Sequence, residues 1–195
     1  MTKEQAYHIC RAAAAIANVE YVTVFGSNAI VFWLDEIGMN DTKELLQEYT
    51  SRELDLSVSE EEELNILVDA TIGEMSMFDK TFGIYGHANP MRNLFKVPKS
   101  WISRLKVEND PLSETKIVIP HPLDLVFSKM IGFREKDFVF CKRVMRAFKL
   151  KLEDLKKLVN EYIYDNPQET EKVLKAFKIL QNKVRTKSTF LSKLK

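Results

Sequence analysis

Apolar residues in the first 120 positions alternate between the spacing of helices and the spacing of strands. A period of three to four residues predicts helices over residues 3–18, 28–38 and 59–72. Short runs rich in β-branched and aromatic residues predict strands over residues 21–25, 52–58, 81–85, 103–107 and 116–119. This order of elements predicts an α/β (α+β) fold in which helices flank a mixed sheet.

After Pro120 the apolar residues keep helical spacing up to the last ten residues of the chain. Asn166 and Pro167 have the residue types favoured at an N-cap and at the first position of a helix. We therefore expect an α/β domain over residues 1–120 and a C-terminal helical domain over residues 121–195. The predicted helices of the second domain span residues 122–133, 136–148, 152–162 and 166–180.

The composition of the 195 residues is that of a globular chain, with 45% hydrophobic and 29% charged residues. Six glycines and six prolines are too few for a collagen-like or low-complexity chain. The length fits one compact domain or two small ones, which agrees with the two predicted parts.

Two further features predict a cytoplasmic protein with no membrane partner. The longest apolar stretch, near residues 28–34, is far shorter than the roughly 20 residues that cross a bilayer, and the N-terminus has no signal-peptide pattern. Cys10 and Cys141 are too few and too far apart for a disulfide framework, which suits a reducing compartment.

Charge is divided unevenly along the chain. Residues 121–195 contain 18 Lys and Arg against 9 Asp and Glu, whereas residues 1–120 contain 11 against 19. A basic surface that includes Lys183, Arg185 and Lys187 can bind the phosphates of an RNA. The alternative is a solvated helix face that docks on the acidic part of the same chain.

The most informative arrangement is a strand, a Gly-Ser turn, a helix and a second strand with two carboxylates on one face. Gly26 and Ser27 follow the first strand, and backbone N–H groups at such a turn can hold a triphosphate. Glu53 and Asp55 share one face of the second strand because strand side chains alternate. The two carboxylates can bind Mg²⁺ (or Mn²⁺). A phosphate-binding turn beside metal-binding carboxylates is the layout of metal-dependent phosphoryl or nucleotidyl transfer. A chance occurrence in a chain with 28 acidic residues is the alternative.

Four longer segments carry a more specific pattern: VFGSNAIVFWL, TSRELDLSV, LVDATIGEMSMFDKTFGIYGHA and HPLDLVFSKMIGFREKDFVF. These segments, which run from residue 24 to residue 140, resemble a family of bacterial proteins described as nucleotidyltransferase-like, and the resemblance covers roughly residues 22–141. That family is usually grouped with the DNA polymerase beta-type nucleotidyltransferase superfamily and, more loosely, with the AbiEii-type toxins of toxin–antitoxin systems.

The resemblance implies a nucleotidyltransferase-like fold and assigns residues to roles. Gly26 and Ser27 match the Gly-Ser signature that binds nucleotide, and Glu53 and Asp55 match the paired metal carboxylates that serve catalysis. The implied activity transfers NMP from an NTP to a hydroxyl of RNA or protein, with an antitoxin protein as a partner if the chain is a toxin.

The chain departs from that family pattern at the metal ligands. Glu53 stands where the superfamily commonly has aspartate, and a third carboxylate is usual on a later strand. Asp79 and Glu108 are the candidates for this third ligand. If it is missing, the alternative function is a non-catalytic module that binds nucleotide or nucleic acid.

The helical domain contributes two more candidates. Lys129 and Lys136 are seven residues apart, so on one continuous helix they share a face from which Lys129 and Arg134 can reach the triphosphate in a cleft between the domains. The alternative is an ion pair between Arg134 and Asp137 at the start of a helix, with Gly132 separating two helices.

The remaining reactive residues predict no further site. His8, His87 and His121 each lack a second ligand at helical or hairpin spacing, so we expect no zinc site. Cys141 lies in the apolar register of its helix, which predicts a buried thiol.

Overall fold

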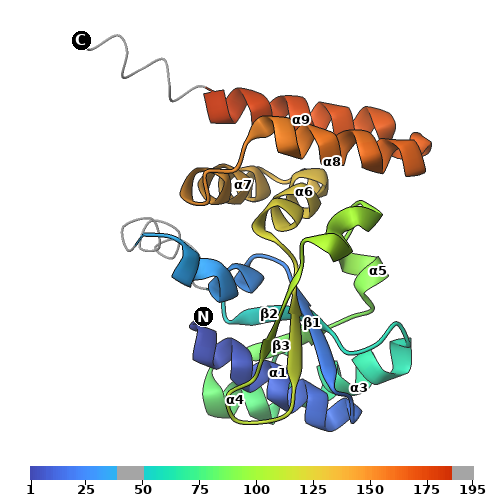
Figure 1. Ribbon diagram of the computed structural model, residues 1–195. Helices are drawn as coiled ribbons and strands as arrows, with labels where there is room; N and C mark the ends of the chain where they lie inside the picture. The colour runs from blue at the N-terminus through green and yellow to red at the C-terminus, as the bar shows by residue number, and fades with distance from the viewer. Residues whose placement is uncertain (39–50, 186–195) are drawn as a thin grey trace. The chain divides into compact units, whose positions relative to one another are not determined.

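The computed structural model describes residues 1–38 and 51–185, which form two compact units (Figure 1). The first contains Met1–Phe95 and Ile102–His121, and the second contains Lys96–Trp101 and the chain from Pro122 onward. The predicted class is confirmed: a mixed sheet with flanking helices is followed by a helical region.

A five-stranded sheet forms the centre of the first unit. Its strands span Tyr21–Phe25 (β1), Glu53–Ser57 (β2), Tyr85–Ala88 (β3), Lys106–Asn109 (β4) and Lys116–Ile119 (β5). β1 pairs antiparallel with β2 and parallel with β5, and β2 also pairs parallel with β3. With β4 antiparallel to β5, the order is β3-β2-β1-β5-β4, so β2 lies between β1 and β3.

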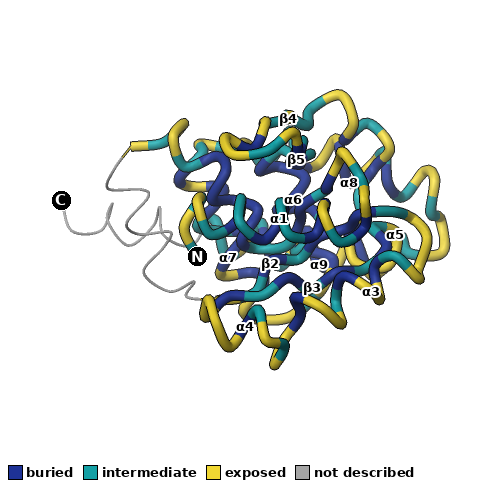
Figure 2. Tube along the Cα trace, turned by 90° about the horizontal axis from the view of Figure 1, so that it is seen from below, coloured by how far each residue is buried: buried dark blue, intermediate teal, exposed yellow. Residues whose placement is uncertain are grey.

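One face of the sheet packs on two helices, α1 (Lys3–Ala17) and α3 (Glu62–Ile72). Leu54 and Leu56 point toward these helices and are fully buried. The strands in this region alternate between buried and half-buried residues, as the colours along β2 and β3 show (Figure 2). The hydrophobic face is therefore closed, and every second residue of β2 and β3 is left on the other face.

The strand predicted over residues 81–85 is wrong. A short helix, α4 (Met77–Phe82), covers the first two residues of that range, and β3 begins only at its last residue, Tyr85. Ser76 caps it by accepting a hydrogen bond from the backbone N–H of Asp79, and Gly83 ends it with φ of 68°. The cap and the left-handed glycine therefore override the strand propensity of the intervening residues.

Other element boundaries also differ from the expectation. The helix predicted over residues 28–38 is a 3₁₀ helix, η1 (Asn28–Glu36). The strand predicted over residues 103–107 begins only at Lys106, because η2 (Lys99–Ser103) precedes it. A further short helix, α5 (Met91–Leu94), was not expected.

The helix after β2, α3, begins without a side-chain cap. Its N-cap is Glu61, and the backbone is held instead by the buried side chain of Asn65. The Asn65 amide donates to the carbonyls of Ser59 and Glu61, at 2.7 and 2.8 Å. It also accepts from the backbone N–H of Val58, so one buried amide fixes the whole turn.

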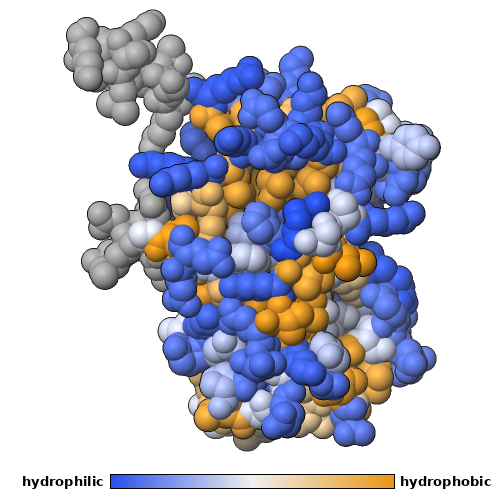
Figure 3. Space-filling view, in the orientation of Figure 1, coloured by the Kyte–Doolittle hydropathy of each residue, from blue (hydrophilic) through white to orange (hydrophobic). Residues whose placement is uncertain are grey.

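The second unit is helical, as predicted. Its helices span Pro122–Gly132 (α6), Glu135–Ala147 (α7), Leu152–Asp165 (α8), Pro167–Glu169 (η3) and Thr170–Arg185 (α9). α6 contacts α7, α8 and α9, and Phe127 and Phe140 are almost fully buried among them. Cys141 is buried as expected, and burial raises the pKa of its thiol. In the view of Figure 3, hydrophilic residues cover much of the surface over α8 and α9.

No helix within residues 1–38 and 51–185 is both long enough and apolar enough to cross a membrane.

The packing of β3 on the helices gives a stability prediction. A Cβ atom at Gly86 would lie 3.0 Å from Ile9 and 3.1 Å from both Ile72 and Leu56. We expect Gly86→Val to lower the free energy of unfolding by about 1–3 kcal/mol, because the added branches overpack this core. Urea unfolding measures the change.

The control for this variant is Val107→Ala on β4, where the side chain is 49% exposed and truncation should change stability by less than about 0.5 kcal/mol. A Gly86→Val protein as stable as the parent would contradict the described packing.

Candidate metal centre

The pleat of β2 places two carboxylates on the open face of the sheet. Leu54 and Leu56 turn toward α1 and α3, so Glu53 and Asp55 turn the opposite way. Both carboxylates are partly exposed, with 34% and 25% of their side-chain surface accessible. The sequence-based prediction that these two residues share a face agrees with this alternating burial.

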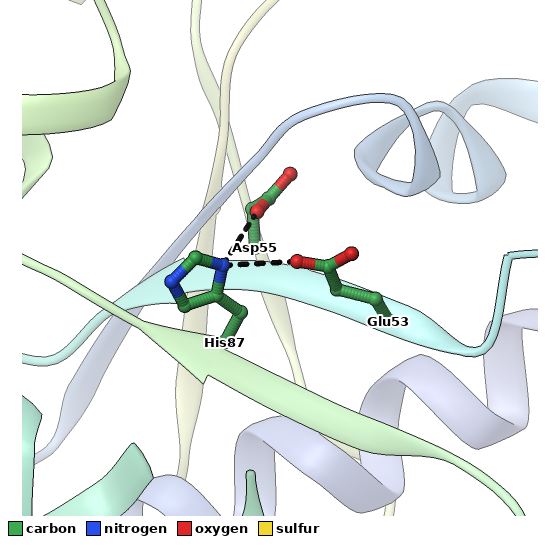
Figure 4. Close-up of side chains that lie close together, drawn as sticks. All are labelled: Glu53, Asp55 and His87. Atoms are coloured by element: carbon green, nitrogen blue, oxygen red, sulfur yellow. Dashed lines mark hydrogen bonds and ion pairs between the residues drawn. The ribbon is translucent and has the colours of Figure 1, made fainter. Parts of the chain in front are cut away.

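His87 on the neighbouring strand completes the group. β3 is parallel to β2 with Asp55 opposite His87, so the imidazole projects from the same face as the two carboxylates. His87 Nδ1 lies 2.9 Å from Glu53 Oε1 and 3.6 Å from Asp55 Oδ1 (Figure 4). One ligand atom from each of the three residues lies within 4.8 Å of the others.

The two carboxylates change the acid–base behaviour of the imidazole. Hydrogen bonds with Asp55 and Glu53 stabilise the protonated ring and raise the pKa of His87 to about 10. On the other side of the ring, the Asn89 amide nitrogen lies 2.7 Å from Nε2. A doubly protonated ring needs an acceptor there, which the Asn89 amide supplies when its oxygen faces Nε2.

The Gly-Ser turn meets the same carboxylate cluster. Phe25, the last residue of β1, lies opposite Asp55, and the chain then turns at Gly26 with φ of 73°. A Cβ atom on Gly26 would lie only 1.9 Å from Asp55 Oδ2. Glycine is therefore required twice, by the left-handed backbone and by the approach of the turn to the carboxylate.

Asn28 fastens the start of η1 to β2. Its side chain is 6% exposed, and its amide nitrogen donates to the backbone carbonyls of Ser51 and Glu53, at 3.2 and 2.5 Å. Ser27 lies between Gly26 and this anchor and is half-buried. The turn therefore has a fixed position relative to the strand that carries the carboxylates.

Neither sequence candidate for a third acidic ligand joins the group. Asp79 forms an ion pair with Arg52 and accepts a hydrogen bond from the backbone N–H of Met75. Glu108 is on β4, two strands beyond β1, where it pairs with Lys3 and Lys106. Within the described ranges, the side chains that gather at Glu53 and Asp55 to form a possible metal site include His87 and neither of these acids.

The expectation that His87 is isolated is therefore wrong. Its partners are 34 and 32 residues earlier in the chain and meet it only through strand pairing. A period-two pattern in residues 85–88, where Gly86 and Ala88 are the buried members, is the local signal that could have placed His87 on the open face.

The candidates from the helical region lie in the second unit. Lys129 is near the end of α6 and Lys136 is in α7. The two lysines therefore lie on different helices, and the shared helical face expected for them does not form. Arg134 forms a two-pronged ion pair with Asp137, at 2.7 and 3.1 Å. The alternative interpretation of this segment, an ion-paired helix start after Gly132, describes the observed contacts.

The donor set on the sheet fits a divalent cation. Ligands about 2.1 Å from an octahedral ion lie about 3 Å apart at neighbouring positions, close to the spacing of His87 Nδ1 from the two carboxylates. Two carboxylates and a neutral imidazole would leave further positions for water or substrate oxygens. The residues can therefore hold a metal ion, and their partial exposure leaves it accessible.

Comparisons of the chain with protein-family models, with curated proteins and with solved structures find no match.

The raised pKa of His87 gives a prediction for the metal-free protein. The pKa of His87 in the folded protein lies above the ordinary value of 6.5, so this group stabilises the fold fully below pH 6.5 and loses that effect as pH rises through about 10. NMR titration of the imidazole in a chelator should show a pKa near 10 in the parent. In Glu53→Gln/Asp55→Asn it should fall toward 6.5.

Glu61→Gln serves as the control, since it removes an exposed carboxylate at the N-cap of α3 and should leave the His87 titration unchanged. A parent imidazole that titrates near 6.5 would contradict the described contacts.

Proposed function

We propose that the protein is a divalent-metal-dependent nucleotidyltransferase, which moves NMP from an NTP to a hydroxyl of RNA or protein with Mg²⁺ or Mn²⁺ and releases pyrophosphate. The observation that carries the proposal is the approach of Gly26 to Asp55, because it joins the turn and the carboxylates in one site. The resemblance of residues 22–141 to nucleotidyltransferase-like proteins points to the same chemistry.

In this proposal the two halves of the site have separate tasks. The backbone N–H groups of the turn at Gly26 and Ser27 bind the phosphates, assisted by the N-terminal end of η1. Glu53 and Asp55 hold the metal, with His87 as the third ligand. When bound, the ion stabilises negative charge on the attacked phosphate and lowers the pKa of the acceptor hydroxyl.

Positioning supplies most of the expected rate. The amide of Asn28 and the pairing of β1 with β2 hold the turn and the carboxylates in a fixed relation before substrate binds. A triphosphate on the turn would therefore meet ligands that need little rearrangement, which lowers the entropic cost of reaching the transition state.

A non-catalytic nucleotide- or nucleic-acid-binding module is the second candidate function. The observation that favours it is the histidine in place of a third carboxylate: His87 brings no negative charge and, when protonated, neutralises the metal ligands. Such a module would bind nucleotide at the turn without transferring it.

The partners belong to the same proposal. Lys129 and Arg134 are proposed to bind nucleotide phosphates on the basis of the resemblance. An antitoxin protein is the proposed partner if the transfer is toxic, and the cytoplasm is the proposed compartment. RNA is the acceptor that the basic end of the chain favours, with Lys183 and Arg185 in α9 and Lys187 outside the described residues.

The transfer assay compares two glycines that share a backbone conformation. Gly26 and Gly83 have φ of 73° and 68°, but a Cβ at Gly83 meets no atom within 4 Å, whereas one at Gly26 meets Asp55. We expect Gly26→Ala to lower NMP transfer at least 100-fold, since it displaces a metal ligand and narrows the phosphate site. Gly83→Ala carries similar backbone strain and should retain transfer.

The measurement incubates each protein with each labelled NTP, Mg²⁺ or Mn²⁺, and total cellular RNA or protein, and follows label on the macromolecule. Asp55→Asn should also lose transfer. Nucleotide binding by the parent without any label would overturn the enzyme in favour of the binding module.

RNA binding is tested through its salt dependence. If Lys183, Arg185 and Lys187 each contact one phosphate, replacing all three by Ala should lower the slope of log K against log salt by about 2 for single-stranded RNA. Filter binding between 50 and 200 mM salt, about the range in which such contacts weaken, measures the slope.

The control removes three exposed lysines before and within α8, Lys151, Lys156 and Lys157, and should leave the slope nearly unchanged. Equal slopes for the parent and the Lys183, Arg185 and Lys187 variant would remove RNA contacts from this segment. The role of Lys183 would then be structural, through its ion pair with Glu135.

A further inference from the structure

We propose that His87 makes the centre selective for a first-row transition-metal ion such as Mn²⁺ over Mg²⁺, and that Asn89 is the positioning residue that orients the imidazole. The proposal deepens the metal centre of the proposed function. It rests on the contacts of His87 with Glu53, Asp55 and Asn89.

The selectivity follows from the chemistry of the donor atoms. Mg²⁺ prefers oxygen ligands and retains much of its water, so an imidazole nitrogen adds little to its binding. Transition-metal ions accept imidazole readily, and Mn²⁺ accepts carboxylates as well. A centre of two carboxylates and one imidazole therefore favours Mn²⁺ by the contribution of its nitrogen ligand.

The nitrogen is held at the centre by the backbone. Asp55 and His87 are opposite one another in the parallel pairing of β2 and β3. Gly86 and Ala88, on either side of His87, are buried in the core, which fixes His87 on the opposite face of the strand. Nδ1 is the ring atom that faces the carboxylates, at 2.9 and 3.6 Å. An ion that binds Glu53 and Asp55 is thus within reach of this nitrogen.

Asn89 lies at the other end of the same ring. Its backbone N–H donates to the carbonyl of Leu56 at 3.0 Å, which ties it to β2, and its amide lies 2.7 Å from His87 Nε2. With a metal on Nδ1, the ring proton is on Nε2 and needs an acceptor. The Asn89 amide oxygen fills that need after a half-turn of the amide and fixes the tautomer that binds metal.

Partial exposure separates this group from a purely structural ion pair. The side chains of His87, Glu53 and Asp55 are 40%, 34% and 25% exposed, so water and substrate can approach the same ion. The two carboxylates also carry one negative charge more than a protonated imidazole can neutralise. A divalent cation with a neutral imidazole balances both carboxylates.

The experiment measures Mn²⁺ binding to the full chain by electron paramagnetic resonance, with and without a non-hydrolysable NTP analogue. Mg²⁺ competition should show that the parent binds Mn²⁺ at least 10-fold more tightly than Mg²⁺. Pulsed measurements should detect coupling of the bound Mn²⁺ to ¹⁴N. His87→Asp exchanges the nitrogen ligand for an oxygen ligand. This variant should therefore retain metal binding, lose the nitrogen coupling and show a smaller preference for Mn²⁺.

Asn89 is tested by loss and rescue. Asn89→Leu should weaken Mn²⁺ binding about 10-fold, in the range typical of residues that orient a metal ligand. Asn89→Asp restores an acceptor for Nε2–H and should recover the affinity. His8→Asn removes an imidazole that packs on Phe78 outside the centre, and it should change neither affinity nor nitrogen coupling.

The inference and the proposed function fail in different ways. Bound Mn²⁺ without nitrogen coupling, equal affinity for the two ions, or no Mn²⁺ binding with or without nucleotide would overturn the inference. Nitrogen-coupled Mn²⁺ in a protein that transfers no NMP would overturn the enzyme and leave the metal selectivity in place.

Discussion

The register of β2 between β1 and β3 is the constraint on which the rest of the site depends. Burial of Leu54 and Leu56 against α1 and α3 fixes that register, because a slip of one residue would expose both leucines and bury Glu53 and Asp55 in the core. The same register brings the β1 turn to Asp55 from one side and His87 from the other. Hydrophobic packing on one face of the sheet thus positions the polar chemistry of the opposite face.

The polar face concentrates negative charge that a cation can balance. Glu53 and Asp55 project from one strand face, and like charges at this separation repel. Without metal, a protonated His87 reduces that repulsion, and its hydrogen bonds with Asp55 and Glu53 raise the pKa of the imidazole. A bound metal ion would take over this role, with the imidazole as a ligand. Proton and metal therefore compete for the same nitrogen, and the partly exposed side chains give both access.

The sequence predicted what local patterns determine and missed what strand pairing determines. Alternation within residues 52–58 was sufficient to place Glu53 and Asp55 together, and the helical pattern after Pro120 was sufficient for the helical region. His87 was missed because its partners are more than 30 residues away and because β3 was expected too early. The capped helix α4 shifts that strand toward the C-terminus, a competition that strand propensity alone does not resolve.

The proposed metal centre is tested most directly by a crystal structure, from crystals soaked with Mn²⁺ and a non-hydrolysable NTP, in which anomalous diffraction locates manganese. We expect an anomalous peak about 2.2 Å from an oxygen of Glu53, an oxygen of Asp55 and Nδ1 of His87, and phosphate density on the Gly26 turn. Manganese and nucleotide bound elsewhere, with the three side chains keeping their direct contacts, would contradict it.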